Sequence, residues 1–533
     1  MSNSVAVSST PVLVVGAGPV GLTAALELRR RGIACRIVDG LSEPPQYAKA
    51  VGVQPRTLEL WEAAGVLPAA LDAALALRGQ LVYKDGALVA DVRMQLPPDM
   101  PFGFTALPQY ETERILADTL AGYGTVVERG VRLTSFTQDD TGVAALLDSG
   151  EEIRAGYLVG ADGAHSTVRK GLGLTFEGAA FSEEYMLGDV EVDWSLPAGH
   201  AVRLAKGDDL LVAIPLPGDH RYRLTMLAPP ELGTPPPADG EIAHGFEGGR
   251  RPTLADLQTV LDRLAPEAAT ARTLRWSSVF RISHRIVDAY SRGRVFVAGD
   301  AAHIHPPTGG QGMNTGIQDA VNLAWKLALA VRGEAAPGLL ASYDAERRPV
   351  GEEVVGRTTA AARGDGVVID PDDPWVAVRR EAQLLVGYRG SPIVGPPAPD
   401  LPAGAPQPGD RAPDARGLRR EIAQYPLRLL PLLGSPRHTV VLYADSADAA
   451  AWIRATAAAL PSGVDVLAVV AAELDPVTGV PTVVDAEGEF RAAYAATDGS
   501  SFLIRPDLYL AARTPSPDPA ALRQALALSV MEP

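Results

Sequence analysis

The segment with the most unusual chemistry is residues 295–316, VFVAGDAAHIHPPTGGQGMNTG. An apolar run ends at Asp300, and histidines, prolines and glycines follow before a helical pattern begins. A carboxylate at a strand end can accept hydrogen bonds from ligand hydroxyls, and glycines leave the backbone open to a flat ligand. His303 and His305 could instead start a metal site, but the extended segment offers no third ligand. We therefore expect no metal, and we interpret His303 as a hydrogen-bonded structural residue.

A second segment of this kind lies near the N-terminus, where GAGPVG follows the apolar run of residues 12–15 and precedes a helical pattern. In such a turn Gly16 permits the tight bend, Gly18 lets a pyrophosphate approach the backbone, and Gly21 lets helix and strand pack closely. The next predicted strand, ACRIVD, ends at Asp39, where a carboxylate can accept hydrogen bonds from a ribose. This βαβ unit predicts a site for a dinucleotide that contains ADP.

The third segment is GADGAHSTVR, residues 160–169, in which a predicted strand delivers Asp162 to the start of a helix. His165 and Ser166 lie beside it, but their spacing does not suggest a nucleophilic triad, and the chain has no GxSxG elbow. FAD and NAD share the GxGxxG fingerprint, and no second copy follows a strand as separate sites for both would require. One tightly bound dinucleotide is therefore expected.

In this order and at these spacings, the three segments resemble the FAD-dependent aromatic hydroxylases, the single-component flavoprotein monooxygenases. The similarity is to the branch that contains phenol hydroxylase and the aromatic polyketide hydroxylases, and it spans residues 10 to about 395. It implies an α/β fold with a Rossmann-like FAD-binding domain and an inserted antiparallel substrate domain. Residues 405–533 resemble the thioredoxin-like C-terminal domain of that branch.

The resemblance also implies roles for individual residues. The implied cofactor-binding residues are Gly16, Gly18, Gly21, Asp39, Lys49, Gln109, Asp162, Gly299, Asp300, Gly312, Met313 and Asn314. Lys49 stands where the family usually has an arginine, and Asp39 lacks the basic residue that often follows the family's acid. Pro307 and Asn314 are implied at the reacting centre, with the Pro307 carbonyl toward the substrate and Asn314 beside the flavin. The amides that open the helix would stabilise the charge of a reduced flavin.

A different pattern fills residues 183–280, where short alternating runs predict antiparallel strands and one helix, TLADLQTVLDRL. We expect this to be the substrate domain, with residues 80–105 contributing to the site. The flanking FAD-binding parts would be residues 1–182 and 281–395. The predicted substrate-binding residues are Phe104, Tyr222, Leu224 and Met226, with Met94, Phe102 and Ile214 as further candidates for the cavity.

The composition limits the remaining possibilities. Cys35 is the one cysteine, so the thioredoxin-like domain predicted for residues 396–533 has no redox pair and we expect a structural role for it. The formal charge of −16 argues against a nucleic acid or an anionic membrane as partner. The N-terminal residues show neither a basic region nor a long apolar region, so a cytoplasmic location is expected. A homodimer is also considered.

The family's chemistry implies NADPH or NADH as electron donor, FAD as cofactor, and molecular oxygen and a small aromatic molecule as substrates. A flavin C4a-hydroperoxide would hydroxylate a phenolic ring, and the resemblance favours a polycyclic polyketide. Baeyer–Villiger insertion by the same intermediate stays open, as does a flavin-binding protein without turnover. No side chain stands out as the base that ionises the phenol.

Overall fold

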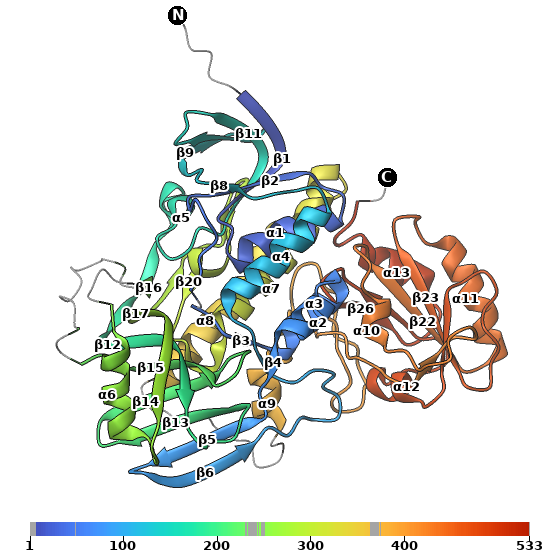
Figure 1. The fold of residues 1–533 in the computed structure, drawn as a ribbon. Helices are drawn as coiled ribbons and strands as arrows, with labels where there is room; N and C mark the ends of the chain where they lie inside the picture. The colour runs from blue at the N-terminus through green and yellow to red at the C-terminus, as the bar shows by residue number, and fades with distance from the viewer. Residues whose placement is uncertain are drawn as a thin grey trace, which may run out of the picture.

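The computed structural model describes residues 7–47, 49–229, 232, 242, 245–246, 251–362, 373 and 375–531. Two large sheets lie one above the other on one side of the molecule, and a third sheet with its own helices forms the C-terminal part (Figure 1). None of the helices described is both long and apolar enough to cross a membrane.

The first sheet positions the three sequence segments. Its order is β18-β19-β11-β1-β2-β8, with β10 on β11 and β9 on β10. The strands β1, β2, β8, β11 and β19 run parallel to their neighbours in this core. The bounds are β1 (Val7–Val15), β2 (Cys35–Asp39), β8 (Glu128–Arg129), β9 (Leu133–Gln138), β10 (Val143–Leu147), β11 (Glu152–Gly160), β18 (Ser291–Arg292) and β19 (Val295–Val297). Because parallel strands end at one edge, Gly16, Asp39, Asp162 and Asp300 are brought to the same edge of the sheet.

Helices cover this sheet and carry part of the site. α1 (Pro19–Arg30) packs against both α4 (Gln109–Gly122) and α7 (Gly312–Arg332), and α7 also contacts α2 (Pro55–Ala64) and α8 (Ser342–Ala362). The apolar residues 12–14 of β1 are fully buried in the resulting core. Shorter elements complete this part: α3 (Leu67–Ala73), α5 (Thr167–Gly171), α9 (Trp375–Glu381), η2 (Gly299–Ala301), η3 (Thr308–Gly310), and the small sheet of β3 (Gly52–Val53), β4 (Leu75–Ala76) and β7 (Thr105–Ala106).

The second sheet is the expected insertion and is antiparallel except for the parallel pair β5–β13, but it is larger than residues 183–280. Its order is β16-β17-β12-β15-β14-β13-β5-β6, with β20 on β17. The bounds are β5 (Gly79–Lys84), β6 (Ala87–Arg93), β12 (Phe176–Asp193), β13 (His200–Lys206), β14 (Asp209–Pro215), β15 (Arg221–Leu227), β16 (Gly245–Phe246), β17 (Thr270–Val287) and β20 (His303–Ile304). β12 and β17 pair along their length and cross the expected boundaries at 182/183 and 280/281.

One helix covers the outer face of this sheet. α6 (Leu254–Leu264) begins at a capping box, in which the Thr253 hydroxyl accepts from the Asp256 amide and the Asp256 carboxylate accepts from the Thr253 amide. Its apolar side packs on residues of β12, β13, β14 and β15 to form a separate core. The other face of the sheet is therefore directed toward the FAD-binding part.

The C-terminal part is a mixed sheet of order β21-β24-β23-β22-β25-β26. β22 runs parallel to β23 and β23 to β24, whereas β25 and β26 run antiparallel to their neighbours. The bounds are β21 (Leu418–Arg419), α10 (Leu429–Leu432), β22 (Thr439–Ala444), α11 (Ala447–Ala459), β23 (Asp465–Ala471), β24 (Thr482–Asp485), α12 (Glu489–Tyr494), β25 (Ser501–Ile504), β26 (Leu510–Thr514) and α13 (Pro519–Leu526). Arg505 of this part forms a buried ion pair with Glu346 of α8, which fastens the two parts together.

Candidate active site

The turn from β1 to α1 has the geometry of a pyrophosphate cradle. Gly16 has φ +99°, and a Cβ there would lie 2.3 Å from the Ala161 carbonyl oxygen. A Cβ on Gly21 would lie 1.9 Å from the Gly16 oxygen, so close packing excludes a side chain at both positions. Gly18 differs, because it has extended backbone before α1 and a Cβ there would meet nothing within 4 Å. The open space beside this helix N-terminus fits a phosphate group.

The end of β2 supplies the acid predicted to bind a ribose. One oxygen of Asp39 accepts from the Ala17 amide at 2.7 Å and the other from the Leu41 amide at 2.8 Å. Arg129 of β8 lies 3.5 Å from the same carboxylate. The sequence lacks a basic residue directly after Asp39, but the parallel neighbour β8 supplies one at this edge. A carboxylate has about four acceptor positions, so Asp39 can still accept from a ligand hydroxyl.

Lys49 and Asp300 meet across the site. The Lys49 ammonium lies 2.6 Å from a carboxylate oxygen of Asp300, and both side chains are about one third exposed, at 36% and 33%. Asp300 is placed by Gly299, whose φ of +59° and lack of a Cβ allow close contact with Val20 of α1. An acid and a base of opposite charge thus face each other where the resemblance implies the FAD chain.

The loop before α7 carries no formal charge. Gly309 and Gly310 have φ of +73° and +64°, and the exposed Pro307 offers its carbonyl to the Gly310 amide at 3.0 Å. Burial and the neighbouring His303 lower the pKa of His305 to about 4, so this imidazole is neutral near pH 7. A neutral loop before the positive end of a helix dipole suits an electron-accepting ring. The Pro307 carbonyl has a second lone pair, so its implied contact with the substrate stays a prediction.

The side chain of Asn314 makes its hydrogen bonds within the protein. Its carbonyl oxygen accepts from the Gln54 amide at 2.9 Å and the Thr57 hydroxyl at 2.8 Å, and its amide nitrogen donates to the Gly52 and Gly310 carbonyls. The side chain is fully buried. Its hydrogen-bonding capacity is used in joining α7 to the segment before α2, so only the backbone of Asn314 is left to face a flavin. Gly312 and Met313 are the first residues of α7, and their contact with a flavin stays a prediction.

Gln109 and Asp162 organise the site from either side. Gln109 accepts from the Ala50 amide at 3.0 Å and donates to Glu113 at 2.8 Å. Asp162 accepts from the Ser166 hydroxyl and from the Thr167 amide at 2.7 Å, so it caps α5 and fixes the loop after β11. The direct contact of both residues with FAD stays a prediction.

Glu113 was not predicted from the sequence. It is 3% exposed, and its Oε2 has no hydrogen-bond partner among the described residues. Burial raises its pKa to about 7, despite the opposing hydrogen bond from Gln109 and the charge of Arg129. An apolar or amide residue would be expected at a buried helix position, so the carboxyl is an unusual feature of this site.

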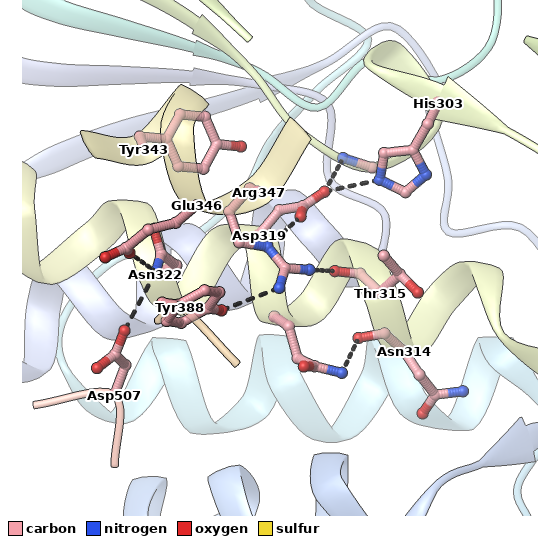
Figure 2. Close-up of polar contacts among 12 residues, drawn as sticks. His303, Asn314, Thr315, Asp319, Asn322, Tyr343, Glu346, Arg347, Tyr388 and Asp507 are labelled. Carbon is pink, nitrogen blue, oxygen red and sulfur yellow. Dashed lines mark hydrogen bonds and ion pairs between the residues drawn. The ribbon is translucent and has the colours of Figure 1, made fainter. Parts of the chain in front are cut away.

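A buried polar network supports the loop around Asp300 (Figure 2). Asp319 of α7 accepts from the Gly299 amide at 3.1 Å, from His303 at 2.8 Å and from Arg347 of α8 at 2.7 Å. Arg347 also donates to Tyr388 at 2.9 Å and to the Thr315 carbonyl. His303 is therefore the hydrogen-bonded structural residue that we predicted. The described residues contain no group of three or more His, Cys, Asp or Glu side chains able to hold a metal ion.

The predicted substrate-binding residues of β15 lie on the wrong face of the sheet. Tyr222, Leu224 and Met226 are buried in the core beneath α6 and cannot line a cavity beside the flavin. Phe104 packs with Met100 and other residues of a separate small cluster. Of the further candidates, Ile214 does face inward, where it packs near Tyr110 and other residues of a different cluster.

The residues that do face the FAD-binding part alternate with those predicted. Arg221 donates to Asp189 at 2.9 Å and to the Tyr110 hydroxyl at 2.8 Å. Arg223 donates to the Lys49 carbonyl at 3.2 Å and lies 5.8 Å from the centre of the Trp276 ring. The alternation Arg, Tyr, Arg, Leu in the sequence was the available signal, since one face had to be charged and the other apolar.

Comparison with known proteins agrees with this site. Residues 9–358 match a protein-family model described as "FAD binding domain". The chain is 35% identical over 545 residues to 6-methylpretetramide 4-monooxygenase of Streptomyces rimosus, covering 94% of this chain and 90% of that protein. It is 33% identical over 390 residues to 12-dehydrotetracycline 5-monooxygenase/anhydrotetracycline 6-monooxygenase of Streptomyces rimosus subsp. rimosus, covering 69% and 71%.

A solved structure of aklavinone-11 hydroxylase with FAD and aklavinone matches with a TM-score of 0.76 and 28% identity, covering 97% of this chain and 98% of that one. Anhydrotetracycline hydroxylase from Streptomyces rimosus matches with a TM-score of 0.71 and 29% identity, covering 98% and 100%. The chain belongs to the FAD-dependent aromatic hydroxylases, the flavoprotein monooxygenases that include tailoring enzymes of antibiotic polyketides.

Proposed function

We propose that the protein is an NAD(P)H-dependent enzyme that uses FAD to hydroxylate a phenolic, polycyclic polyketide. The observation that carries this proposal is the contact between the two halves of the site. Arg223, on the inner face of the substrate sheet, donates to the carbonyl of Lys49, and Lys49 itself pairs with Asp300 at the cofactor edge. A ring held against this face would therefore lie beside the cofactor. The names of the relatives support the polyketide class.

When bound, FAD would take a hydride from NAD(P)H and then activate molecular oxygen. The residues of this chain bind and orient the reactants. The turn from Gly16 to Gly21 would hold the pyrophosphate, Asp39 the ribose, and Asp300 the ribityl hydroxyls. The backbone amides that open α7 would face the ring and stabilise added negative charge. The substrate sheet would cover the site and keep water away from the reacting atoms.

Four measurements test this function. Purified protein should be yellow with bound FAD, and a phenolic polycycle should accelerate its consumption of NADPH or NADH. Oxygen-18 gas should place one labelled atom in the product. Product mass and structure then separate a new hydroxyl group from an oxygen inserted into a ring. If no simple or polycyclic phenol accelerates the oxidation of NADPH or NADH, the proposed activity is wrong.

The remaining parts of the proposal concern organisation. We propose that the C-terminal part is a thioredoxin-like domain, which the parallel β22, α11, β23 unit and the antiparallel β25 and β26 support. A structural role is proposed for it, since Cys35 lies outside it. The division into FAD-binding, substrate and C-terminal domains is proposed with the substrate sheet extended as the strands require. The cytoplasmic location and the homodimer stay predictions.

A further inference from the structure

Arg223 is the one charged side chain on the inner face of β15 whose donors are largely unused. It is 5% exposed, yet its Nε and Nη1 have no hydrogen-bond partner among the described residues. Among the described residues, its one hydrogen bond runs from Nη2 to the Lys49 carbonyl, at 3.2 Å. A buried guanidinium with unmet donors destabilises a protein, so such groups commonly await a ligand or serve a reaction.

The surrounding charges do not neutralise it. Asp189 is its cross-strand neighbour, but that carboxylate accepts two hydrogen bonds from Arg221, which also donates to Tyr110. Lys49 is matched by Asp300. Each of these two ion pairs is neutral in itself, so among these charged groups Arg223 is left as an unmatched positive charge. Burial lowers the pKa of Arg223 to about 10, with Asp189 opposing, and the group is still charged at pH 7.

Two aromatic side chains lie beside Arg223. Trp276 of β17 lies on the same face, with its ring centre 5.8 Å from the guanidinium carbon. Tyr47, from the segment that leads to Lys49, lies 5.8 Å from Trp276 between ring centres, with the two planes tilted by 30°. A flat, electron-rich ligand that carries an anionic oxygen satisfies both the aromatic side chains and the unmet donors.

We propose that Arg223 holds the ionised hydroxyl oxygen of the phenolic substrate, so that the enzyme binds its substrate as the phenolate. This inference rests on the proposed function. The oxygen–hydrogen bond of the phenol breaks, the proton passes to water, and the electron pair stays on the oxygen that accepts from Arg223. The absence of an evident base in the sequence is then explained, because a fixed positive charge makes the ionised form the stable one without a proton acceptor in the protein.

The test is a titration of a coloured phenol on the oxidised FAD-containing protein, without NADPH. Alizarin is the probe, because its visible absorbance reports ionisation of its hydroxyl groups. A positive charge within about 4–6 Å lowers the pKa of an acid by about 1–3, so half-ionisation should occur at a proton concentration about 10- to 1000-fold higher on the protein than in buffer. Alizarin that ionises on the wild-type protein at the same pH as in buffer overturns the inference.

Variants assign the effect to the residue. Arg223→Gln should abolish the shift, and Arg223→Lys should retain part of it, because the charge stays and the planar fork is lost. Arg263→Gln on α6 is the control, since Arg263 is half exposed on the outer face, and it should titrate like wild type. An undiminished shift in Arg223→Gln refutes the assignment. Loss of FAD from Arg223→Gln would indicate that this arginine binds the cofactor, and this result would refute the assignment as well.

The activity assay separates this inference from the proposed function. A protein that oxidises NADPH when phenols are added but leaves alizarin unshifted keeps its function and contradicts the anion site. A protein that shifts alizarin through Arg223 but never oxidises NADPH supports the anion site and contradicts the function.

Discussion

Replacement of Arg347 by methionine should destabilise both the protein and the loop that carries Asp300. Arg347 is fully buried and donates to Asp319 at 2.7 Å, to Tyr388 at 2.9 Å and to the Thr315 carbonyl at 3.1 Å. Removing one partner of a buried pair leaves the other charge uncompensated, which costs about 3–5 kcal/mol of unfolding free energy. With about 2–4 °C per kcal/mol for large domains, the melting temperature should fall by roughly 6–20 °C.

The neighbouring residue supplies the matched control. Arg348 lies on the same helix with its side chain 35% exposed, and it pairs with Glu352 on the surface. Such exposed pairs contribute about 0–1 kcal/mol, so Arg348→Met should melt within a few degrees of wild type. Thermal unfolding followed by circular dichroism measures both variants at equal flavin loading. Equal melting temperatures for Arg347→Met and Arg348→Met would refute the importance of this network.

The stability that the Asp319–Arg347 pair contributes should change with pH in a defined direction. Burial raises the pKa of Asp319, but Arg347 and His303 lower it more, so the pKa lies below its usual value. In wild type this stabilisation is present above the carboxyl's ordinary pKa and is lost as the pH falls through the lowered one. Without Arg347 the pKa of Asp319 should rise. Acidification toward pH 5 should then protonate Asp319 in Arg347→Met and reduce the difference in unfolding free energy between this variant and wild type. Arg347→Met with Asp319→Asn should lose less stability than Arg347→Met alone.

Three further predictions concern single side chains. Asp300→Ala should weaken FAD binding roughly 10- to 100-fold through lost charged hydrogen bonds, which is measured as flavin absorbance per protein. The variant Asp118→Ala, at an exposed position, is the control. An unchanged flavin content in Asp300→Ala would contradict the assignment. Because burial raises the pKa of Glu113 to about 7, wild-type stability should fall as the pH rises from about 4.5 to 7. The unfolding free energy of Glu113→Gln minus that of wild type should therefore rise by about 2–4 kcal/mol between pH 5 and pH 8. A difference in unfolding free energy that does not change with pH would contradict this prediction. Leu224→Ala should cost about 2–5 kcal/mol in denaturant unfolding and leave the KM for the phenol unchanged, whereas a raised KM would return Leu224 to the substrate cavity.

The sequence predicted the features that depend on neighbouring residues in the chain. The glycine spacing of GAGPVG, the apolar run before it and the helical pattern after it are local, and the structure has β1, the turn and α1 in these places. The helical pattern expected after the glycine-rich loop is α7, which extends from Gly312 to Arg332. The sequence also placed Asp39 and Asp300 at the ends of apolar runs, and the parallel pairing in the structure brings these ends to one edge.

The sequence pattern does not distinguish the two faces of a strand, and the tertiary structure determined which face of β15 points toward the site. Alternation along β15 defines two faces but does not say which one α6 covers, and so Tyr222 was assigned to the cavity while Arg223 was missed. Arg129 lies 90 residues after Asp39 in the sequence and reaches it from the neighbouring strand β8, which no local pattern could show. Backbone sterics set which side chains of a strand share a face, so the sequence pattern shows this directly. Which element packs against each face depends on long-range contacts. For this reason the charged face of the site was found in the fold and not in the sequence.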